Sequence, residues 1–185
     1  MSHHTSDAVL QFWFQELTPE QWFQGGEEVD AMIRNKFLAT HTAVAANECW
    51  HWRNSVSGAL AEIIVLDQFS RNIYRGTAQA FASDGQALAL AQIAISHGLD
   101  QLVTEVERPF FYLPYMHSES KVVHEEALRL FTDLGSDDHL KYEKIHKDII
   151  DRFGRYPHRN EVLGRASTVE EDAYLAETNH VFFNV

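Results

Sequence analysis

One short stretch of this acidic chain is strongly basic. It is RFGRYPHRN, residues 152–160, which contains three arginines and one histidine. Its glycine and proline predict irregular backbone after a helix, so these side chains should lie on a loop. Guanidinium groups are planar and permanently charged, and they suit two-point contact with carboxylates or phosphates. The stretch therefore predicts either an anion-binding site or a counter-charge for internal carboxylates such as Asp67 and Asp84. The candidate ligand-binding residues on this loop are Arg155, His158, Arg159 and Asn160.

A second set of polar residues lies on a helix that we expect over residues 55–72. Apolar side chains occupy nearly every direction of its 59–72 part, and this pattern is typical of a buried helix. At about 100° per residue, Asp67 falls close to Leu60 and Arg71 follows one turn later, so both continue an apolar face. Buried charges need partners, so the pair either forms a hydrogen-bonded structural network or lines a solvated pocket. The candidate ligand-binding residues here are Asp67, Gln68, Arg71, Asn72 and Arg75.

Two histidines and a glutamate are the candidate catalytic groups. His117 and Glu119 follow an aromatic segment broken by a proline, and a His/Glu pair at a helix start suits acid–base work or metal binding. Glu119 is equally explained as a first-turn carboxylate that the helix dipole stabilises. His146 falls on the apolar arc of a helix expected over 137–153. It is either a core histidine with satisfied hydrogen bonds or, beside a carboxylate, a base that titrates near neutral pH.

Several familiar motifs are incomplete in this sequence. Glu143-x-x-His146 and Glu177-x-x-His180 have the spacing of a di-iron ligand pair, but no matching bundle carboxylates are evident. The sequence therefore predicts no metal site, and it identifies no cofactor. It also contains no H-E-x-x-H, no phosphate loop and no G-x-S-x-G.

Composition limits the classes of partner. The 185 residues are 45% hydrophobic with a formal net charge of −12, which argues against nucleic-acid or membrane binding but allows a local basic pocket. A chain of this length should form one domain, residues 1–185. With one cysteine, Cys49, and no signal-peptide pattern at the start, we expect a cytoplasmic protein. We expect the aromatic side chains near the start of the chain to lie in the core; they are residues 12–14, Trp22 and Phe23. If some of them are exposed, they predict a protein interface, such as that of a homo-oligomer.

Helical periodicity recurs along the chain and alternating strand patterns are almost absent, so we expect an all-α fold. The predicted helices cover residues 5–17, 27–46, 55–72, 84–97, 119–134 and 137–153, with short ones after Thr104 and Thr168. Pro114 should interrupt the segment that follows Thr104, and Ser83 should cap the 84–97 helix through a capping box. The 55–72 and 84–97 helices are the predicted centre. Short connections favour antiparallel helical hairpins in a tetratricopeptide-like bundle or short superhelix.

Several long motifs occur in an order that resembles a known family. They are VLQFWF (9–14), LDQFSRNIYRG (66–76), FASD (81–84), YLPYMHSES (112–120) and RFGRYPHRN with LGRAST and EE (152–171). Together they resemble a bacterial domain-of-unknown-function family, number nine hundred and twenty-four, over essentially the whole chain. The resemblance implies an all-helical, tetratricopeptide-like bundle and brings no established activity. The chain departs from the family pattern at Ser120 and at HEEA (124–127), where an acidic residue and a nearby glutamine are expected.

If the fold brings these polar motif residues together, they form one pocket of arginines, histidines and carboxylates. The leading hypothesis is a helical binding module whose groove holds an anionic small molecule or a peptide. The alternative is a hydrolase in which His117 or His146 acts as base together with Glu119. In that case Arg71 or Arg155 stabilises negative charge. A third interpretation is that all these groups are structural and the function lies on an outer surface.

Overall fold

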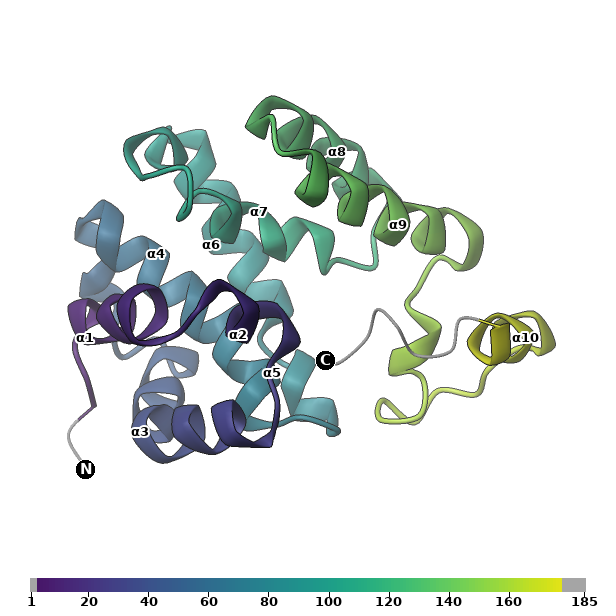
Figure 1. The fold of residues 1–185 in the computed structure, drawn as a ribbon, viewed down its shortest axis with the longest axis horizontal. Coiled ribbons are helices and arrows are strands. Elements are labelled where there is room, and N and C mark those ends of the chain that lie inside the picture. The colour runs from purple at the N-terminus through teal and green to yellow at the C-terminus, as the bar shows by residue number, and fades with distance from the viewer. Residues whose placement is uncertain (1–2, 178–185) are drawn as a thin grey trace.

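Start and stop signals in the sequence account for most of the helices. The computed structural model describes residues 3–177, which form helices and turns with no strand among them, so the predicted all-α fold is confirmed (Figure 1). The side chain of Thr5 caps the first helix, and left-handed glycines, Gly135 and Gly154, end two of the long ones. The longer helices are α3 (Glu27–Ala45), α6 (Asp84–Ser96), α8 (Lys121–Leu134) and α9 (Asp137–Phe153). The shorter ones are α1 (Ser6–Gln11), α2 (Pro19–Gln24), α4 (Val56–Ile64), α5 (Ser70–Ile73), α7 (Pro109–Met116) and α10 (Val169–Glu177).

Three local features differ from the sequence expectations. Helix α2, which the periodicity does not indicate, is stabilised by a capping box between Thr18 and Gln21. Ser83 makes no side-chain hydrogen bond that caps α6, so the capping box expected there is wrong. Pro114 lies inside α7 and does not interrupt it. Every residue of α7 is buried, and this packing outweighs the cost of an internal proline, about 3 kcal/mol.

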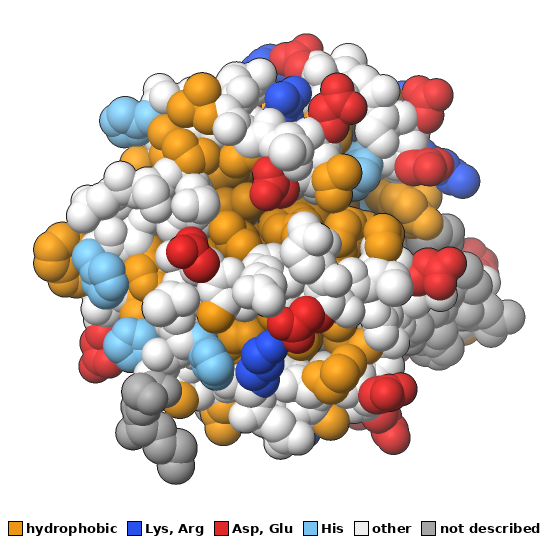
Figure 2. All heavy atoms as spheres, turned by 60° about the vertical axis from the view of Figure 1, so that its left-hand side comes forward, with side chains coloured by type: hydrophobic (Ala, Val, Ile, Leu, Met, Phe, Trp, Pro, Cys, Tyr) orange, Lys and Arg blue, Asp and Glu red, His pale blue; other side chains and the backbone are white. Residues whose placement is uncertain are grey.

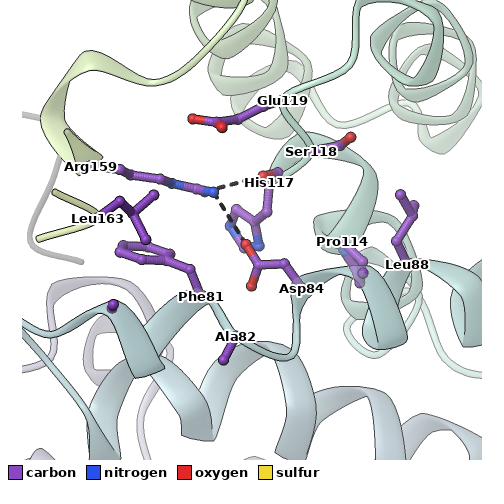
Figure 3. Close-up of a pocket in the computed structure, with 12 residues that line it drawn as sticks. Phe81, Ala82, Asp84, Leu88, Pro114, His117, Ser118, Glu119, Arg159 and Leu163 are labelled. Carbon is purple, nitrogen blue, oxygen red and sulfur yellow. Dashed lines mark hydrogen bonds and ion pairs between the residues drawn. The ribbon is translucent and has the colours of Figure 1, made fainter. Parts of the chain in front are cut away.

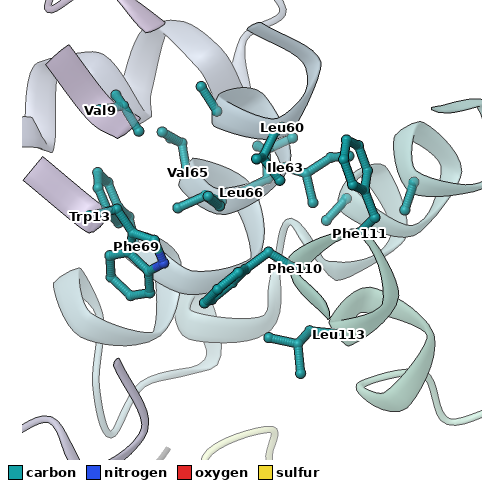
Figure 4. Close-up of a cluster of buried hydrophobic side chains, with 14 of the residues drawn as sticks. Val9, Trp13, Leu60, Ile63, Val65, Leu66, Phe69, Phe110, Phe111 and Leu113 are labelled. Atoms are coloured by element: carbon teal, nitrogen blue, oxygen red, sulfur yellow. The ribbon is translucent and has the colours of Figure 1, made fainter. Parts of the chain in front are cut away.

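The buried centre is built around one long helical stretch. Helices α4 and α5 run on through a wider turn at Val65–Phe69, and every residue from 58 to 73 is buried, as the sequence predicts. Side chains from α1 and α7 pack against it (Figure 4). The sequence also predicts a central α6, but only the alanine face of this helix is buried, and Ile93 is 57% exposed. That prediction is therefore wrong for the outer half of α6.

The C-terminal part of the chain adds a helical hairpin and a crossing segment. Helices α8 and α9 lie side by side, joined by a short turn (Figure 1). After α9 the chain continues as mostly irregular backbone over 154–168 and then forms α10. The hairpin agrees with the predicted antiparallel pairing, whereas the tetratricopeptide-like superhelix and the single domain 1–185 stay predictions.

The surface carries several large apolar side chains. Figure 2 shows apolar side chains gathered in a hollow on one face of the molecule, with Asp and Glu side chains around it and few Lys or Arg side chains. Of the aromatic residues near the start of the chain, Phe12 and Trp13 are buried, while Phe23 is 53% exposed. These aromatics are therefore mostly core, and a homo-oligomer stays a prediction. Over residues 3–177, no helix is long and apolar enough to cross a membrane.

Candidate functional site

One carboxylate at the start of α6 holds two buried arginines. Asp84 lies in the first turn of α6, where the helix dipole stabilises negative charge. Arg71, on α5, donates to both oxygens of Asp84 at 3.0 and 3.1 Å, and Arg159 donates to Oδ2 at 3.2 Å. Both arginines are only 6% exposed. The basic loop therefore supplies a counter-charge to an internal carboxylate.

Arg159 is held rigidly, but its hydrogen-bonding capacity is not filled. Its guanidinium lies between the rings of Phe81 and Tyr156, 4.4 and 4.5 Å from their centroids. Nη2 donates to the backbone oxygen of His117 at 3.1 Å, whereas the buried Nε has no hydrogen-bond partner among the described residues. Burial and the neighbouring charge of Arg71 lower the pKa of Arg159. A further negative charge beside this guanidinium would therefore be stabilised.

A buried carboxylate orients His117. Asp67 Oδ1 and His117 Nδ1 are 2.7 Å apart, and Gln68 donates to Asp67 Oδ2 at 2.6 Å. Burial would raise the pKa of Asp67, but His117, Arg71 and the hydrogen bonds outweigh this effect and hold the pKa below its usual range. Burial lowers the pKa of His117 more than Asp67 raises it. The imidazole is therefore neutral near pH 7, with its proton on Nδ1 facing the carboxylate and a lone pair on Nε2.

Asp84, His117 and Arg159 line one cavity of about 310 Å³, which lies between α6, α7 and the loop after α9 (Figure 3). This volume is at the small end of the range for ligand sites, roughly 300–1,000 Å³. The polar part of the wall consists of Asp84, His117, Ser118, Glu119 and Arg159. The apolar part consists of Ala78, Phe81, Ala82, Gly85, Leu88, Pro114 and Leu163. The cavity thus combines charged groups with an apolar wall.

Glu119 forms part of the cavity wall as a paired carboxylate. Arg165 donates to its two oxygens at 2.6 and 2.9 Å, and the backbone N–H of Tyr156 donates to Oε1 at 2.7 Å. Burial would raise the pKa of Glu119, but these bonds lower it, so the group is ionised near neutral pH and is no general acid there. Glu119 also precedes α8, which has no acidic residue in its first turn, so the first-turn interpretation is wrong.

Comparisons with known proteins identify the family. The family model described as "Bacterial protein of unknown function (DUF924)" matches residues 9–179. The chain belongs to this family. The resemblance carried by the sequence motifs is thereby confirmed, and the family description assigns no activity.

One solved structure is similar over nearly the whole chain. It is that of a protein of unknown function, ATU0120 from Agrobacterium tumefaciens, with 38% identity and a TM-score of 0.89. The match covers 93% of this chain and 97% of that chain. No curated protein matches this sequence. The comparisons therefore support the fold and the family and leave the function to be argued from the site.

Two of the sequence-predicted residues belong to a different network. Asn72 donates to Asp30 Oδ1 at 2.9 Å, and Arg75 Nε donates to Asp30 Oδ2 at 2.6 Å. These contacts join α5 to α3. Asn72 and Arg75 do not line the cavity, whereas Arg71 on the same helix contacts Asp84 in its wall.

The rest of the basic loop mainly holds α10. Arg155 donates to both oxygens of Glu171 at 2.6 and 2.8 Å, and Asn160 Nδ2 donates to Glu171 Oε2 at 3.3 Å. Thr168 and Glu171 also exchange the two hydrogen bonds of a capping box, at the start of the short helix that the sequence predicts after Thr168. Arg155 and Asn160 therefore lie in a structural clamp and outside the cavity wall.

His146 and His158 surround a buried tyrosine. Their ring centroids lie 5.7 and 5.4 Å from that of Tyr156. Burial lowers the pKa of each to about 3, and the nearby charge of Arg159 acts in the same direction. Both are neutral near pH 7, and neither lines the cavity. The role of His146 as a catalytic base has no geometric support in this cavity.

A buried pair between α8 and α9 has no counterpart among the predicted site residues. His124 Nδ1 and Glu143 Oε1 are 2.7 Å apart, and both side chains are fully buried. Burial raises the pKa of Glu143, and its second oxygen has no hydrogen-bond partner in the described part of the chain. The sequence signal for this pair is weak, because two separate helices supply the residues.

A sequence signal did exist for the cavity wall. The motif FASD contains both Phe81 and Asp84, which line the cavity.

The described residues offer no metal centre. Over residues 3–177, no group of three or more His, Cys, Asp or Glu side chains is placed to hold a metal ion. His180 of the second Glu-x-x-His motif lies outside the described residues.

The single cysteine, Cys49, is buried. Burial together with the charges of Glu62 and Glu48 raises the pKa of its thiol. Such a thiol is typical of a structural position.

Proposed function

We propose that the cavity binds a small molecule or the end of a short peptide through an anionic group, and that Arg159 contacts that group. The observation that carries the proposal is the unfilled Nε of a guanidinium that is only 6% exposed and lines the cavity (Figure 3). An arginine has five N–H donors. Arg159 uses two of its nitrogens, for Asp84 and for the backbone of His117, so donor capacity is left for a ligand.

The electrostatics of the cavity support an anion beside Arg159. Asp84 is shared with Arg71, which takes both of its oxygens, so Arg159 has only part of one counter-charge. Phe81 and Tyr156 sandwich the guanidinium, so its orientation is already fixed before a ligand binds. A pre-oriented charged donor loses little conformational entropy on binding.

The anion proposal predicts a stabilisation that depends on Arg159. Inorganic phosphate, acetate, succinate and a short peptide are added to the wild type, to Arg159→Met and to Arg152→Met. A ligand at about 100 times its dissociation constant adds about 2.7 kcal/mol, which raises Tm by about 5–10 °C in a chain of this length. We expect this shift in the wild type and its loss in Arg159→Met, which keeps an unbranched stem between the two rings.

Arg152→Met is the matched control, because Arg152 lies on the surface at the end of α9 with its side chain 50% exposed. It should bind the ligand as the wild type does. Circular dichroism of each variant verifies that it is folded. The proposal fails if no anion stabilises the wild type, or if Arg159→Met keeps the full shift.

A second candidate function is hydrolysis, which the pairing of Asp67 with His117 favours. The carboxylate fixes the ring through Nδ1, and the neutral imidazole has a lone pair on Nε2 for a general base. His117 lines the cavity beside Arg159, a cation suited to stabilising developing negative charge. In this version Glu119 and His146 have no acid–base role.

A panel of ester, amide and phosphomonoester substrates, with and without divalent metals, tests the hydrolase candidate. If one substrate turns over, His117→Gln should lower kcat by about 100-fold or more, because a positioned base contributes roughly 10²–10⁴. Arg152→Met again serves as the control and should leave kcat unchanged. Turnover that survives His117→Gln, or no turnover on any substrate, removes this candidate.

A further inference from the structure

The carboxylates of the cavity keep acceptor positions that the protein does not fill. Asp84 Oδ1 accepts one hydrogen bond, from Arg71, and Glu119 Oε2 accepts one, from Arg165, among the described contacts. An ionised carboxylate oxygen accepts about two. The side chains of Asp84 and Glu119 are 18% and 27% exposed, more than the 7% of Arg159. The cavity therefore presents acceptors as well as a cation.

The formal charges around the cavity already balance. Three carboxylates face three guanidinium groups, and His117 is neutral near pH 7. The charged groups are Asp67, Asp84, Glu119, Arg71, Arg159 and Arg165. An anionic group on the ligand has a local partner in Arg159, and a positive group on the same ligand would keep the overall balance of charge. The spacing also fits, because Arg159 Nη1 and Asp84 Oδ2 are adjacent, 3.2 Å apart.

The rest of the wall is apolar and close to the charged pair. Phe81, Leu88, Pro114 and Leu163 line the same cavity. Its volume of about 310 Å³, at the small end of the range for ligand sites, is enough for one amino acid with a large side chain. The apolar wall would therefore take a hydrocarbon side chain next to a charged head group.

We infer that the ligand is a free α-amino acid with an aromatic or branched apolar side chain. Its carboxylate contacts Arg159, its ammonium group donates to Asp84 in the field of Glu119, and its side chain packs between Leu88 and Pro114. An ammonium and a carboxylate joined through one carbon match the adjacent cation and acceptor of the site. This inference rests on the proposed function, and it adds the second charge and the apolar side chain.

Isothermal titration calorimetry of the wild type at pH 7 tests the inference with matched ligands. The first series is L-phenylalanine, 3-phenylpropionate without the ammonium group, and 2-phenylethylamine without the carboxylate. The second is L-leucine, 4-methylpentanoate and isoamylamine. At least one of the two amino acids should bind, and each of its single-charge analogues at least about tenfold more weakly, because each loses a charge-assisted hydrogen bond. Arg159→Met should weaken binding of that amino acid by a similar factor, and Arg152→Met should not.

The outcomes separate this inference from the proposed function. If a carboxylate analogue binds as tightly as its amino acid, the zwitterion is wrong and the anion proposal stands. If an amine analogue binds as tightly as its amino acid, the carboxylate contributes nothing, and both the amino-acid inference and the anion proposal are wrong. If neither amino acid binds but phosphate or succinate does, only the inference fails. If none of these compounds binds, and neither acetate nor the short peptide does, both the inference and the anion proposal fail.

Discussion

Replacing Asp84 with alanine is expected to lower the free energy of unfolding by about 3 kcal/mol. Asp84 accepts hydrogen bonds from both Arg71 and Arg159, which are each 6% exposed. Breaking a buried ion pair by removing one partner costs about 3–5 kcal/mol, because the remaining charge is left buried without compensation. We expect the lower end, since the Asp84 side chain is 18% exposed and water replaces part of the carboxylate. Urea unfolding at pH 7 measures the change.

Asp133→Ala is the matched control for this substitution. Asp133 also pairs with an arginine, Arg129, but the two side chains are 63% and 54% exposed. Surface pairs contribute about 0–1 kcal/mol, so this variant should stay within about 1 kcal/mol of the wild type. Asp84→Asn, which keeps an acceptor oxygen without the charge, should fall between the two. If Asp84→Ala costs no more than Asp133→Ala, the arginines are compensated by other groups and the network described here is wrong.

The local part of the site could be predicted from the sequence. Helical periodicity placed Asp67 and Arg71 on the buried face of one helix, and both are buried there. The ends of α8 and α9, predicted at residues 134 and 153, fall where Gly135 and Gly154 follow, because such signals depend on contacts a few residues apart. The family resemblance also followed from motifs, and it is confirmed over residues 9–179.

The sequence predicted a counter-charge role of the basic loop for carboxylates such as Asp84, but not which arginine would contact which carboxylate. The arginines of one loop have separate partners: Arg159 contacts Asp84, 75 residues away, whereas Arg155 contacts Glu171, 16 residues away. Both choices were chemically open, because any carboxylate suits a guanidinium. Which of them is reached depends on how the backbone turns after α9, and residue type and spacing do not encode that turn. For the same reason the apolar wall around Leu88 had no signal.

Lowering the pH from 7.5 to 5.5 is expected to reduce the free energy of unfolding by about 3–4 kcal/mol. Burial lowers the pKa of His41 to about 4 and those of His146 and His158 to about 3. An unfolded histidine has a pKa near 6.5, so below that pH the unfolded chain binds protons at these three histidines that the folded chain does not. Burial also lowers the pKa values of His117 and His139, which adds to the effect in the same direction. Each histidine then costs about 1.4 kcal/mol per pH unit, and partial exposure of His146 and His158 reduces the total. The loss continues until the pH approaches the folded values and then levels off.

Most carboxylates with shifted pKa values change the free energy of unfolding at a lower pH than the histidines do. The contribution of the histidines can therefore be measured between pH 7.5 and 5.5. The lowered pKa values of Asp67 and Glu119 contribute stability that is lost as the pH falls below about 5. The raised pKa of Glu143 opposes the histidines, because its folded carboxyl takes up a proton at a higher pH than the unfolded one does. Urea unfolding at pH 7.5, 6.5 and 5.5 gives the slope for the wild type and for His41→Gln.

His41 is the best single test of this pH dependence. It is 5% exposed, its Nε2 lies 2.7 Å from Ser70 Oγ, and its Nδ1 has no hydrogen-bond partner within residues 3–177. Ser70 Oγ donates to the backbone oxygen of Leu66 and accepts from Nε2, so no acceptor at Nδ1 offsets the cost of charging the ring. His41→Gln should therefore remove about a quarter to a third of the pH dependence. A wild type equally stable at pH 7.5 and 5.5 would contradict the neutral, buried state of these histidines. That result would also remove the basis for a neutral His117, and with it the general base of the hydrolase candidate.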